Sequence, residues 1–229
     1  MGSLKEHQKD LILHLVRSDA LRFGEFELKS GRVSPYFINV ARAMNTGKSA
    51  SEISKAYATE IMSTVGTGFD FIFGPAYKGI PLAALVSDKL WELYEVDIRW
   101  GYDRKEEKMH GDRGEREIVG DIRDDDRVLI LDDVITTGLT KVDSLKKLES
   151  IKDVTAKGIM IAVDRQELDE NGASIGDLLK QEGLQLYPIL RIRDIFDYLY
   201  NREVDKRIHV NDDIKRSFEE HFKRYGRDQ

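Results

Sequence analysis

Apolar residues along this chain occur in short continuous runs separated by longer stretches with helical spacing. The short runs, which are typical of buried strands, are residues 69–73, 96–100, 128–131, 157–163 and 184–190. Apolar side chains recur every three or four positions, as in amphipathic helices, over residues 48–65, 80–94 and 140–150. This alternation predicts an α/β fold with a central, mostly parallel sheet of about five strands and helices on both of its faces.

The two ends of the chain add further elements. Residues 4–16 have helical spacing, whereas residues 23–40 alternate on either side of a turn at Lys29-Ser-Gly-Arg32, which predicts a hairpin. Two apolar groups near the C-terminus predict two closing helices, and these groups are Ile195, Phe196 and Leu199, then Ile214, Phe218 and Phe222.

Residues 103–117 lack an apolar face. Eleven of these fifteen residues are charged, so burial would be costly and we expect a solvated, mobile loop. Such a run is usually a surface loop without a function. It nevertheless follows a strand, where active-site lids lie, and beside its glycines it carries Arg104, Lys105, Lys108 and His110. Cations on a mobile loop would suit a polyanionic substrate, and both interpretations are open at this point.

Composition narrows the class of protein. With 229 residues and 41% hydrophobic content, the chain can bury one sizeable core, and we expect a single domain over residues 1–229. A net charge of −6 argues against general nucleic-acid binding. No apolar run approaches the roughly 18 residues of a membrane span, and the first residues lack a secretory signal, so we expect a cytoplasmic protein. The absence of cysteine excludes disulfides, thiolate metal sites and cysteine nucleophiles.

The strand at residues 128–131 leads into the clearest candidate for chemistry. It ends in two carboxylates, Asp132 and Asp133, and continues into the hydroxyl-rich loop 136–140. In open α/β sheets, ligands bind beyond the carboxyl ends of strands, where helix N-termini favour anions. Carboxylates suit sugar hydroxyls and the loop suits a phosphate, so this segment predicts a site for a phosphorylated ribose. The plainer alternative is a buried strand followed by an Asp-rich turn and a helix N-cap.

A second strand-to-helix junction, Gly74-Pro-Ala-Tyr-Lys-Gly-Ile-Pro81, has the features of an anion site. Gly74 and Gly79 allow close backbone approach, the helix N-terminus adds its dipole, and Lys78 adds a full charge. An ordinary Gly/Pro turn with a surface lysine is the alternative. A diphosphate bound here would lie on the same edge of the sheet as the ribose site.

Five segments in this order resemble the orotate phosphoribosyltransferase family, one of the type I phosphoribosyltransferases, over nearly the whole chain. They are residues 28–37, 74–81, 104–111, 132–140 and 164–167. The resemblance implies the type I phosphoribosyltransferase fold with a small N-terminal hood, which spans residues 1–40 approximately and is completed by C-terminal elements. It also implies that residues 103–117 are a catalytic flap, and that the peptide bond between Ala76 and Tyr77 is cis.

The family's functional residues carry over to this chain position by position. Contacts to phosphoribosyl diphosphate (PRPP) are implied for Lys29, Tyr77, Lys78, Arg104, Lys105, Lys108, His110, Asp132, Asp133, Thr136, Thr137, Gly138, Leu139 and Thr140. Catalytic roles are implied for Lys105, Lys108, His110, Asp132 and Asp133, and orotate contacts for Phe37, Ile38, Thr136 and Arg165. Two positions depart from the family pattern: Leu139 stands where a small or hydroxyl residue is usual, and Ile38 where an aromatic residue is common.

The resemblance implies transfer of the phosphoribosyl group from PRPP to N1 of orotate, giving orotidine 5′-phosphate and diphosphate. It further implies Mg²⁺ held mainly through PRPP with no direct protein ligand, and a homodimer whose flap is shared across the interface. Whether a separate orotidine 5′-phosphate decarboxylase acts as a further partner is open at this point. Two alternatives are a phosphoribosyltransferase for another nucleobase and a non-catalytic PRPP-sensing regulator. A regulator would need a DNA-binding segment, and the sequence contains no basic recognition helix.

Overall fold

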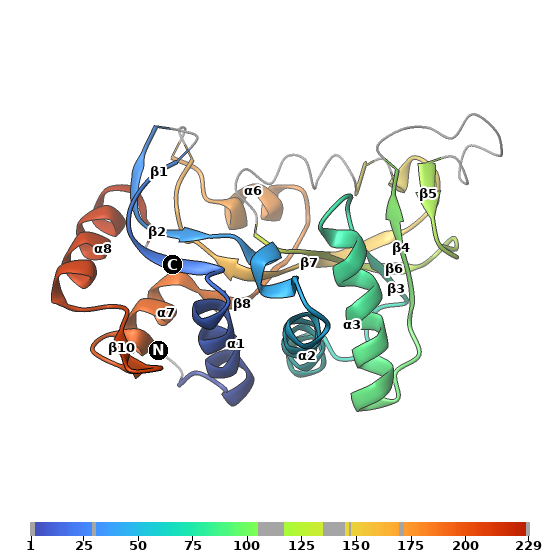
Figure 1. Ribbon diagram of the computed structural model, residues 1–229. Coiled ribbons are helices and arrows are strands. Elements are labelled where there is room, and N and C mark those ends of the chain that lie inside the picture. The colour runs from blue at the N-terminus through green and yellow to red at the C-terminus, as the bar shows by residue number, and fades with distance from the viewer. Residues whose placement is uncertain are drawn as a thin grey trace.

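The central sheet carries the strands that the apolar runs predict. The computed structural model describes residues 3–28, 31–104, 117–134, 145–146, 148–169 and 172–227. Within them, six strands form a sheet in the order β5-β4-β3-β6-β7-β8. Their bounds are β3 (Phe71–Phe73), β4 (Arg99–Asp103), β5 (Ile118–Val119), β6 (Arg127–Asp132), β7 (Thr155–Asp164) and β8 (Leu186–Arg191). Neighbours are parallel except β5, which pairs antiparallel with β4, so the mostly parallel sheet is confirmed (Figure 1).

Strand β6 shows why the predicted strands are continuous apolar runs. Leu129 and Leu131 belong to a large core on one face of the sheet, whereas Val128 and Ile130 belong to a second core on the other face. All four side chains are fully buried. Because helices cover both faces of a parallel sheet, the interior positions of its central strand are buried, and polar side chains are left to the two ends of the strand, Arg127 and Asp132.

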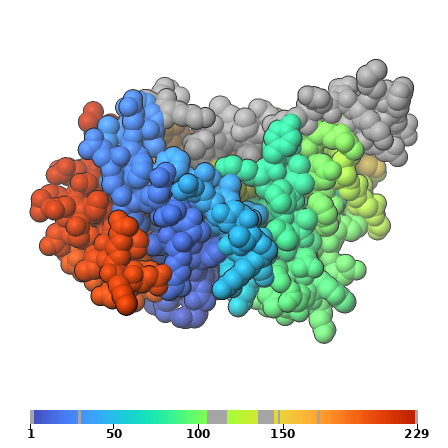
Figure 2. Space-filling model, viewed as in Figure 1, coloured from blue at the N-terminus to red at the C-terminus, as the bar shows by residue number. Residues whose placement is uncertain are grey.

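Helices cover both faces of the sheet. The face with the larger core carries α1 (Glu6–Arg17), the 3-10 helix η1 (Val40–Met44), α2 (Gly47–Thr64) and α3 (Gly79–Tyr94). Helix α2 packs against both α1 and α3 (Figure 1), and the three follow one another across the surface in Figure 2. The other face carries α6 (Ile175–Gln181). In the predicted helix 140–150, the described residues 145, 146, 148 and 149 are helical.

The N-terminal hairpin packs against the two closing helices. Strands β1 (Leu21–Glu27) and β2 (Val33–Ile38) pair antiparallel, and α7 (Ile192–Leu199) and α8 (Asp212–Tyr225) follow late in the chain. Phe196 of α7 stacks on Phe218 of α8 with ring centroids 3.8 Å apart, and Tyr36 of β2 meets both rings edge-on. The predicted hairpin and closing helices are therefore present, and they share an aromatic core.

The strand predicted at residues 96–100 lies three residues later in the chain. Its hydrogen-bonded neighbour β3 begins at Phe71, which pairs with Arg99, so the ladder starts there. The prediction followed the apolar residues Val96 and Ile98, which pack on the core from the preceding loop. Three two-residue strands were not predicted, since so few residues show no alternation: β5, β9 (Glu203–Val204) and β10 (Arg207–Ile208).

The charged segment 103–117 is not solvated at its ends, contrary to the prediction. Asp103 is the last residue of β4, and both Asp103 and Glu117 are buried. The Arg104 N–H donates to the Glu117 carbonyl at 2.8 Å, where β4 meets β5. Residues 105–116 lie outside the described residues. No helix in the described part of the chain has the length and apolar character of a membrane span.

Candidate active site

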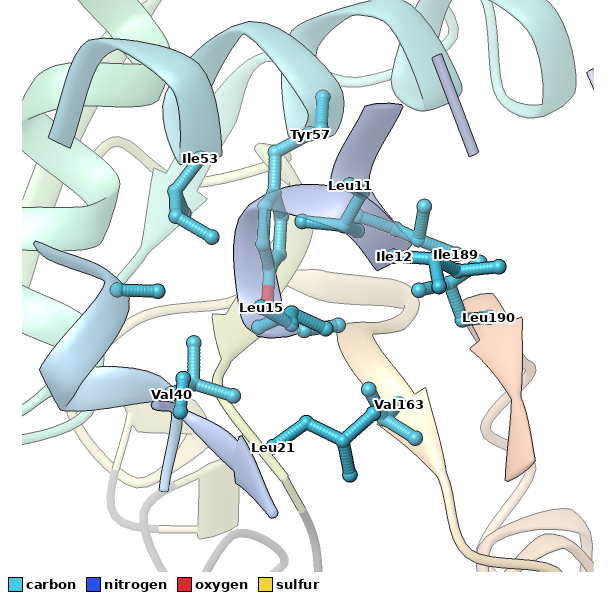
Figure 3. Close-up of a cluster of buried hydrophobic side chains, with 14 of the residues drawn as sticks. Leu11, Ile12, Leu15, Leu21, Val40, Ile53, Tyr57, Val163, Ile189 and Leu190 are labelled. Carbon is cyan, nitrogen blue, oxygen red and sulfur yellow. The ribbon is translucent and has the colours of Figure 1, made fainter. Parts of the chain in front are cut away.

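The carboxyl end of β6 holds two buried carboxylates on a fixed backbone. Asp132 and Asp133 are 1% and 8% exposed. The Tyr57 hydroxyl, from α2, donates to the Asp132 carbonyl oxygen at 2.6 Å, and the Ala162 N–H of β7 donates to the Asp133 carbonyl oxygen at 3.0 Å. Burial, and then the charges of Asp133 and Asp132, raise the pKa of Tyr57 well above its usual value, so this hydroxyl remains a donor. Figure 3 shows the Tyr57 ring pointing from α2 into the buried cluster.

The loop after β3 is closed by contact between its two glycines. The Gly74 N–H donates to the Gly101 carbonyl of β4 at 2.9 Å, and the Gly79 N–H donates to the Pro75 carbonyl at 3.0 Å. A Cβ atom on Gly74 would lie 2.1 Å from the Gly79 carbonyl oxygen, so the loop can close in this way only with glycine at position 74.

The tip of the same loop is held from β4 and faces outward. The Asp103 carboxylate accepts the Ala76 N–H at 2.6 Å. The peptide bond between Ala76 and Tyr77 is cis, as the resemblance implies. Tyr77 is 70% exposed, so its ring is accessible to a ligand. The buried carboxylate at the start of the charged segment thus has a role in holding this loop.

Lys78, from the predicted anion site, contacts Asp133 of the predicted sugar site. Its Nζ atom lies 2.5 Å from Asp133 Oδ2, and the two side chains are 56% and 11% exposed. The loop after β3 and the carboxylates after β6 therefore meet at the same edge of the sheet, as expected for neighbouring parallel strands. In this arrangement a bound polyanion would attract Lys78, and a sugar hydroxyl would hydrogen-bond to Asp133.

Arg165, directly after β7, lies in a second cluster of side chains. Its Nη2 atom donates to Glu167 Oε1 at 2.9 Å, and its Nε atom donates to the Tyr36 hydroxyl at 3.3 Å. Tyr36 in turn donates to Glu167 Oε1 at 2.5 Å, and His221 Nε2 lies 3.2 Å from the same oxygen. The β2 strand of the hairpin is thus fixed to the carboxyl end of β7.

The ionisation of this cluster follows from its contacts. Burial alone would raise the pKa of Glu167, but the hydrogen bond from His221, the charge of Arg165 and the hydrogen bond from Tyr36 lower it to about 2. Burial raises the pKa of Tyr36 well above its usual value, with the charge of Arg165 opposing. Glu167 is therefore an acceptor and Tyr36 a donor at neutral pH.

The other predicted residues are placed in part. Phe37 and Ile38 follow Tyr36 in β2; the Phe37 ring lies 5.7 Å from that of Phe26, and Ile38 packs against the larger core. Arg104 follows β4 at the start of the charged segment. The remaining predicted contacts lie outside the described residues: Lys29, Lys105, Lys108, His110, Thr136, Thr137, Gly138, Leu139 and Thr140.

Comparison with known proteins identifies the family of this chain. Residues 43–166 match the model of the phosphoribosyl transferase domain family. An orotate phosphoribosyltransferase of Agathobacter rectalis is 37% identical over 225 residues, which cover 97% of this chain and 99% of that protein. One from Kluyveromyces lactis is 38% identical over 232 residues, covering 98% and 97%. The crystal structure of orotate phosphoribosyltransferase from Francisella tularensis superposes with a TM-score of 0.80 at 32% identity, covering 94% of this chain and 98% of that one.

The chain belongs to the orotate phosphoribosyltransferases. Its type I phosphoribosyltransferase fold is therefore shown, and it is a transferase of pyrimidine biosynthesis. Five further side chains support the predicted sites of this orotate phosphoribosyltransferase and were not nominated from the sequence: Tyr36, Tyr57, Asp103, Glu167 and His221. Glu167 lies in a segment that carries the resemblance, so its proximity to Arg165 was a usable signal. Tyr57 and His221 come from distant helices and look like ordinary core residues in the sequence.

Proposed function

We propose that this orotate phosphoribosyltransferase transfers the phosphoribosyl group of PRPP to N1 of orotate, releasing diphosphate and forming orotidine 5′-phosphate. The observation that carries the proposal is the contact between Lys78 and Asp133, which joins the diphosphate loop to the ribose carboxylates at one sheet edge. Full-length similarity to proteins with this activity supports the choice of base.

The reaction breaks the bond between C1′ and the diphosphate oxygen through an oxocarbenium-like state. Asp132 and Asp133 would orient the ribose hydroxyls and favour positive character on the ring, since their carboxylates lie at the end of β6. Lys78 and the Tyr77 loop would bind the diphosphate. Lys105, with Lys108 and His110, is proposed to neutralise the charge that accumulates on the departing diphosphate. Residues 136–140 would enclose the 5′-phosphate.

Recognition of orotate is proposed to depend on a cationic side chain. Orotate carries a carboxylate, and Arg165, directly after β7, supplies a guanidinium from a side chain that is 17% exposed. Phe37 and Ile38 lie on the strand that Tyr36 fixes to Arg165, so their backbone groups are the proposed partners for the rest of the base, together with Thr136.

Mg²⁺ is the proposed cofactor, bound mainly through PRPP. In the described ranges, no group of three or more His, Asp or Glu side chains could hold a metal ion. Asp132 and Asp133 offer hard oxygen atoms at the ribose site, which fit Mg²⁺ bound through ribose oxygens or water. When bound, Mg²⁺ would neutralise charge on the diphosphate.

A homodimer with a shared flap is the proposed assembly. Trp91 and Tyr94 of α3 and Trp100 of β4 are 58%, 37% and 37% exposed, and aromatic residues are enriched at protein interfaces relative to the rest of the surface. Strand β4 leads directly into residues 105–116, so a partner copy docked on this surface would bring its own flap close. We also propose action in the cytoplasm, with a separate orotidine 5′-phosphate decarboxylase consuming the product.

Consumption of the base, followed by absorbance, tests the proposed function. The purified chain is mixed with PRPP and Mg²⁺ and with orotate, uracil, adenine or hypoxanthine in turn. Of the four bases, we expect only orotate to be consumed. Its consumption should stop when PRPP is omitted or Mg²⁺ is chelated. Faster use of another base would indicate the alternative transferase. PRPP binding without consumption of any base would indicate a regulator.

A further inference from the structure

The carboxylate of Glu167 is the meeting point of three parts of the molecule. Its Oε1 atom accepts hydrogen bonds from Tyr36 on β2 at 2.5 Å and from Arg165 after β7 at 2.9 Å, and it lies 3.2 Å from His221 Nε2 on α8. The side chains of Arg165, Glu167 and His221 are 17%, 14% and 5% exposed. Hydrogen bonds at such buried sites are electrostatically stronger than those in water, so this carboxylate fixes its donors firmly.

These contacts hold Arg165 along one edge of its guanidinium. The Nε atom donates to Tyr36 and the Nη2 atom to Glu167, and Cζ lies 5.1 Å from the centroid of the Tyr36 ring. Nη1 makes no hydrogen bond to any residue that the structure describes. A planar guanidinium fixed along one edge presents its remaining N–H donors in a defined direction, which suits a carboxylate.

His221 ties the cluster to the hairpin as well. Its Nδ1 atom lies 3.2 Å from the Val33 carbonyl oxygen of β2, and its Nε2 atom faces Glu167. Both partners are acceptors, so the ring donates to both when it carries both protons and to one of them when it is neutral. Either way, the ring spans the gap between β2 and the residue that holds Arg165.

The end of α8 is hydrogen-bonded to residues 164–168, the segment that contains Arg165 and Glu167. The Leu168 N–H donates to the Tyr225 carbonyl at 2.8 Å, and the Arg227 N–H donates to the Gln166 carbonyl at 2.9 Å. Arg227 Nη2 also donates to Asp164 Oδ2 at 3.1 Å. The chain at the end of α8 is therefore hydrogen-bonded to the residues on either side of Glu167, and this fixes His221 beside the Glu167 carboxylate.

We propose that Glu167 and His221 are positioning residues, which hold the Arg165 guanidinium in the orientation that receives the orotate carboxylate. The C-terminal helix thereby sets the affinity for the base through Arg165. This inference rests on the proposed function, because it assumes that Arg165 meets orotate.

Steady-state kinetics of the full chain tests the proposal with Arg165→Ala, Glu167→Gln, His221→Ala and the double variant Arg165→Ala/His221→Ala. Lys215→Ala is the matched control, since Lys215 Nζ on α8 pairs with Asp197 of α7 at 2.5 Å and makes no ion pair with Arg165, Glu167 or His221. We expect the KM for orotate to rise at least about tenfold in Glu167→Gln and about threefold to tenfold in His221→Ala, with the KM for PRPP changed less than about twofold. In the Arg165→Ala background, His221→Ala should add nothing, because it acts through Arg165.

An unchanged KM for orotate in both single variants, or an equal effect of His221→Ala with and without Arg165, would overturn the positioning role. Thermal unfolding identifies a variant that fails to fold, and if Glu167→Gln does so, the Arg165 and His221 variants decide alone. Wild-type protein that does not consume orotate overturns the proposed function and this inference together. Normal consumption by wild type and Lys215→Ala leaves only the positioning role at risk.

Discussion

Asp133 combines burial with a charge that the proposed chemistry uses. Its carboxylate lies at the end of β6, 2.5 Å from Lys78. Asp133→Asn keeps the shape and removes the charge that would serve the ribose, so we expect turnover to fall at least about tenfold while the protein remains folded. Turnover, PRPP affinity and thermal unfolding are measured, with Asp10→Asn, at an exposed position of α1, as the control. Full activity together with unchanged PRPP affinity would refute the ribose assignment.

Glu167 should make the stability of the fold depend on acid. Its pKa of about 2 lies below its ordinary value of 4.5, so the ionised carboxylate stabilises the folded state fully above the unfolded pKa. That stabilisation, about 3 kcal/mol, is lost as the pH falls from 4.5 towards 2. Urea unfolding across this window should show a shallower decline for Glu167→Gln than for wild type. Parallel declines in the two proteins would contradict the assignment.

The residues that we propose to meet a ligand were nominated from the sequence, whereas most of the residues that hold them in place were not. Asp132 ends β6, and Asp133 and Arg165 directly follow β6 and β7, where a local motif reveals them. Tyr57 lies 75 residues before the carbonyl that it binds, and His221 lies 54 residues after Glu167. Such contacts depend on how helices pack on the sheet, which no local pattern specifies.

The loop at residues 74–81, which we propose to bind diphosphate, has a shape that depends on two glycines. A Cβ atom on Gly74 would lie 2.1 Å from the Gly79 carbonyl oxygen, so Gly74→Ala must open the loop and move Lys78 away from Asp133. We expect PRPP affinity to fall at least about tenfold. Gly47→Ala is the control, because its added Cβ meets nothing within 4 Å at the start of α2, where alanine favours the helix. Equal PRPP affinities in the two variants, measured by calorimetry, would show that the closed loop is not required.

Strands and helices with long, regular patterns were predicted closely, and short or edge elements were not. The boundary of α3 was predicted to within one residue, because its periodicity and its flanking Gly/Pro loop agree. Strand β4 was placed three residues early, since its start depends on the partner that it pairs with. Asp103 and Glu117 looked solvated within a charged run, yet both are buried. The β4–β5 ladder includes Asp103, and the next residue, Arg104, donates its N–H to the Glu117 carbonyl.

At the scale of the whole molecule, the site depends on one edge of the sheet. Strands β3, β6 and β7 are neighbours, so their carboxyl ends present the proposed diphosphate loop, the proposed ribose carboxylates and Arg165 in that spatial order. The alternation of strands and helices predicted this edge, because parallel strands place their carboxyl ends together. The packing of the N-terminal hairpin on C-terminal helices has no such local signal, and here the family resemblance supplied the expectation.

The proposed shared flap predicts that two inactive variants restore activity to each other. Lys105→Ala removes the flap cation, and Asp133→Asn removes the ribose charge. If the flap acts on the partner's site in a twofold dimer, a mixed dimer has one site with both defects and one with neither. Half of the dimers are mixed after exchange and each has one intact site of two, so activity should recover to about a quarter of wild type.

Subunit exchange must be verified for this test, by mass spectrometry of differently tagged chains. The matched control mixes Asp133→Asn with Lys78→Ala, because Lys78 and Asp133 contact each other within one chain. When both residues serve the site of their own chain, every mixed dimer has one site impaired by Asp133→Asn and one site impaired by Lys78→Ala. This mixture should therefore recover no activity. Recovery with Lys105→Ala but not with Lys78→Ala assigns the flap to the partner's site. If verified exchange with Lys105→Ala restores no activity, the flap works within its own chain.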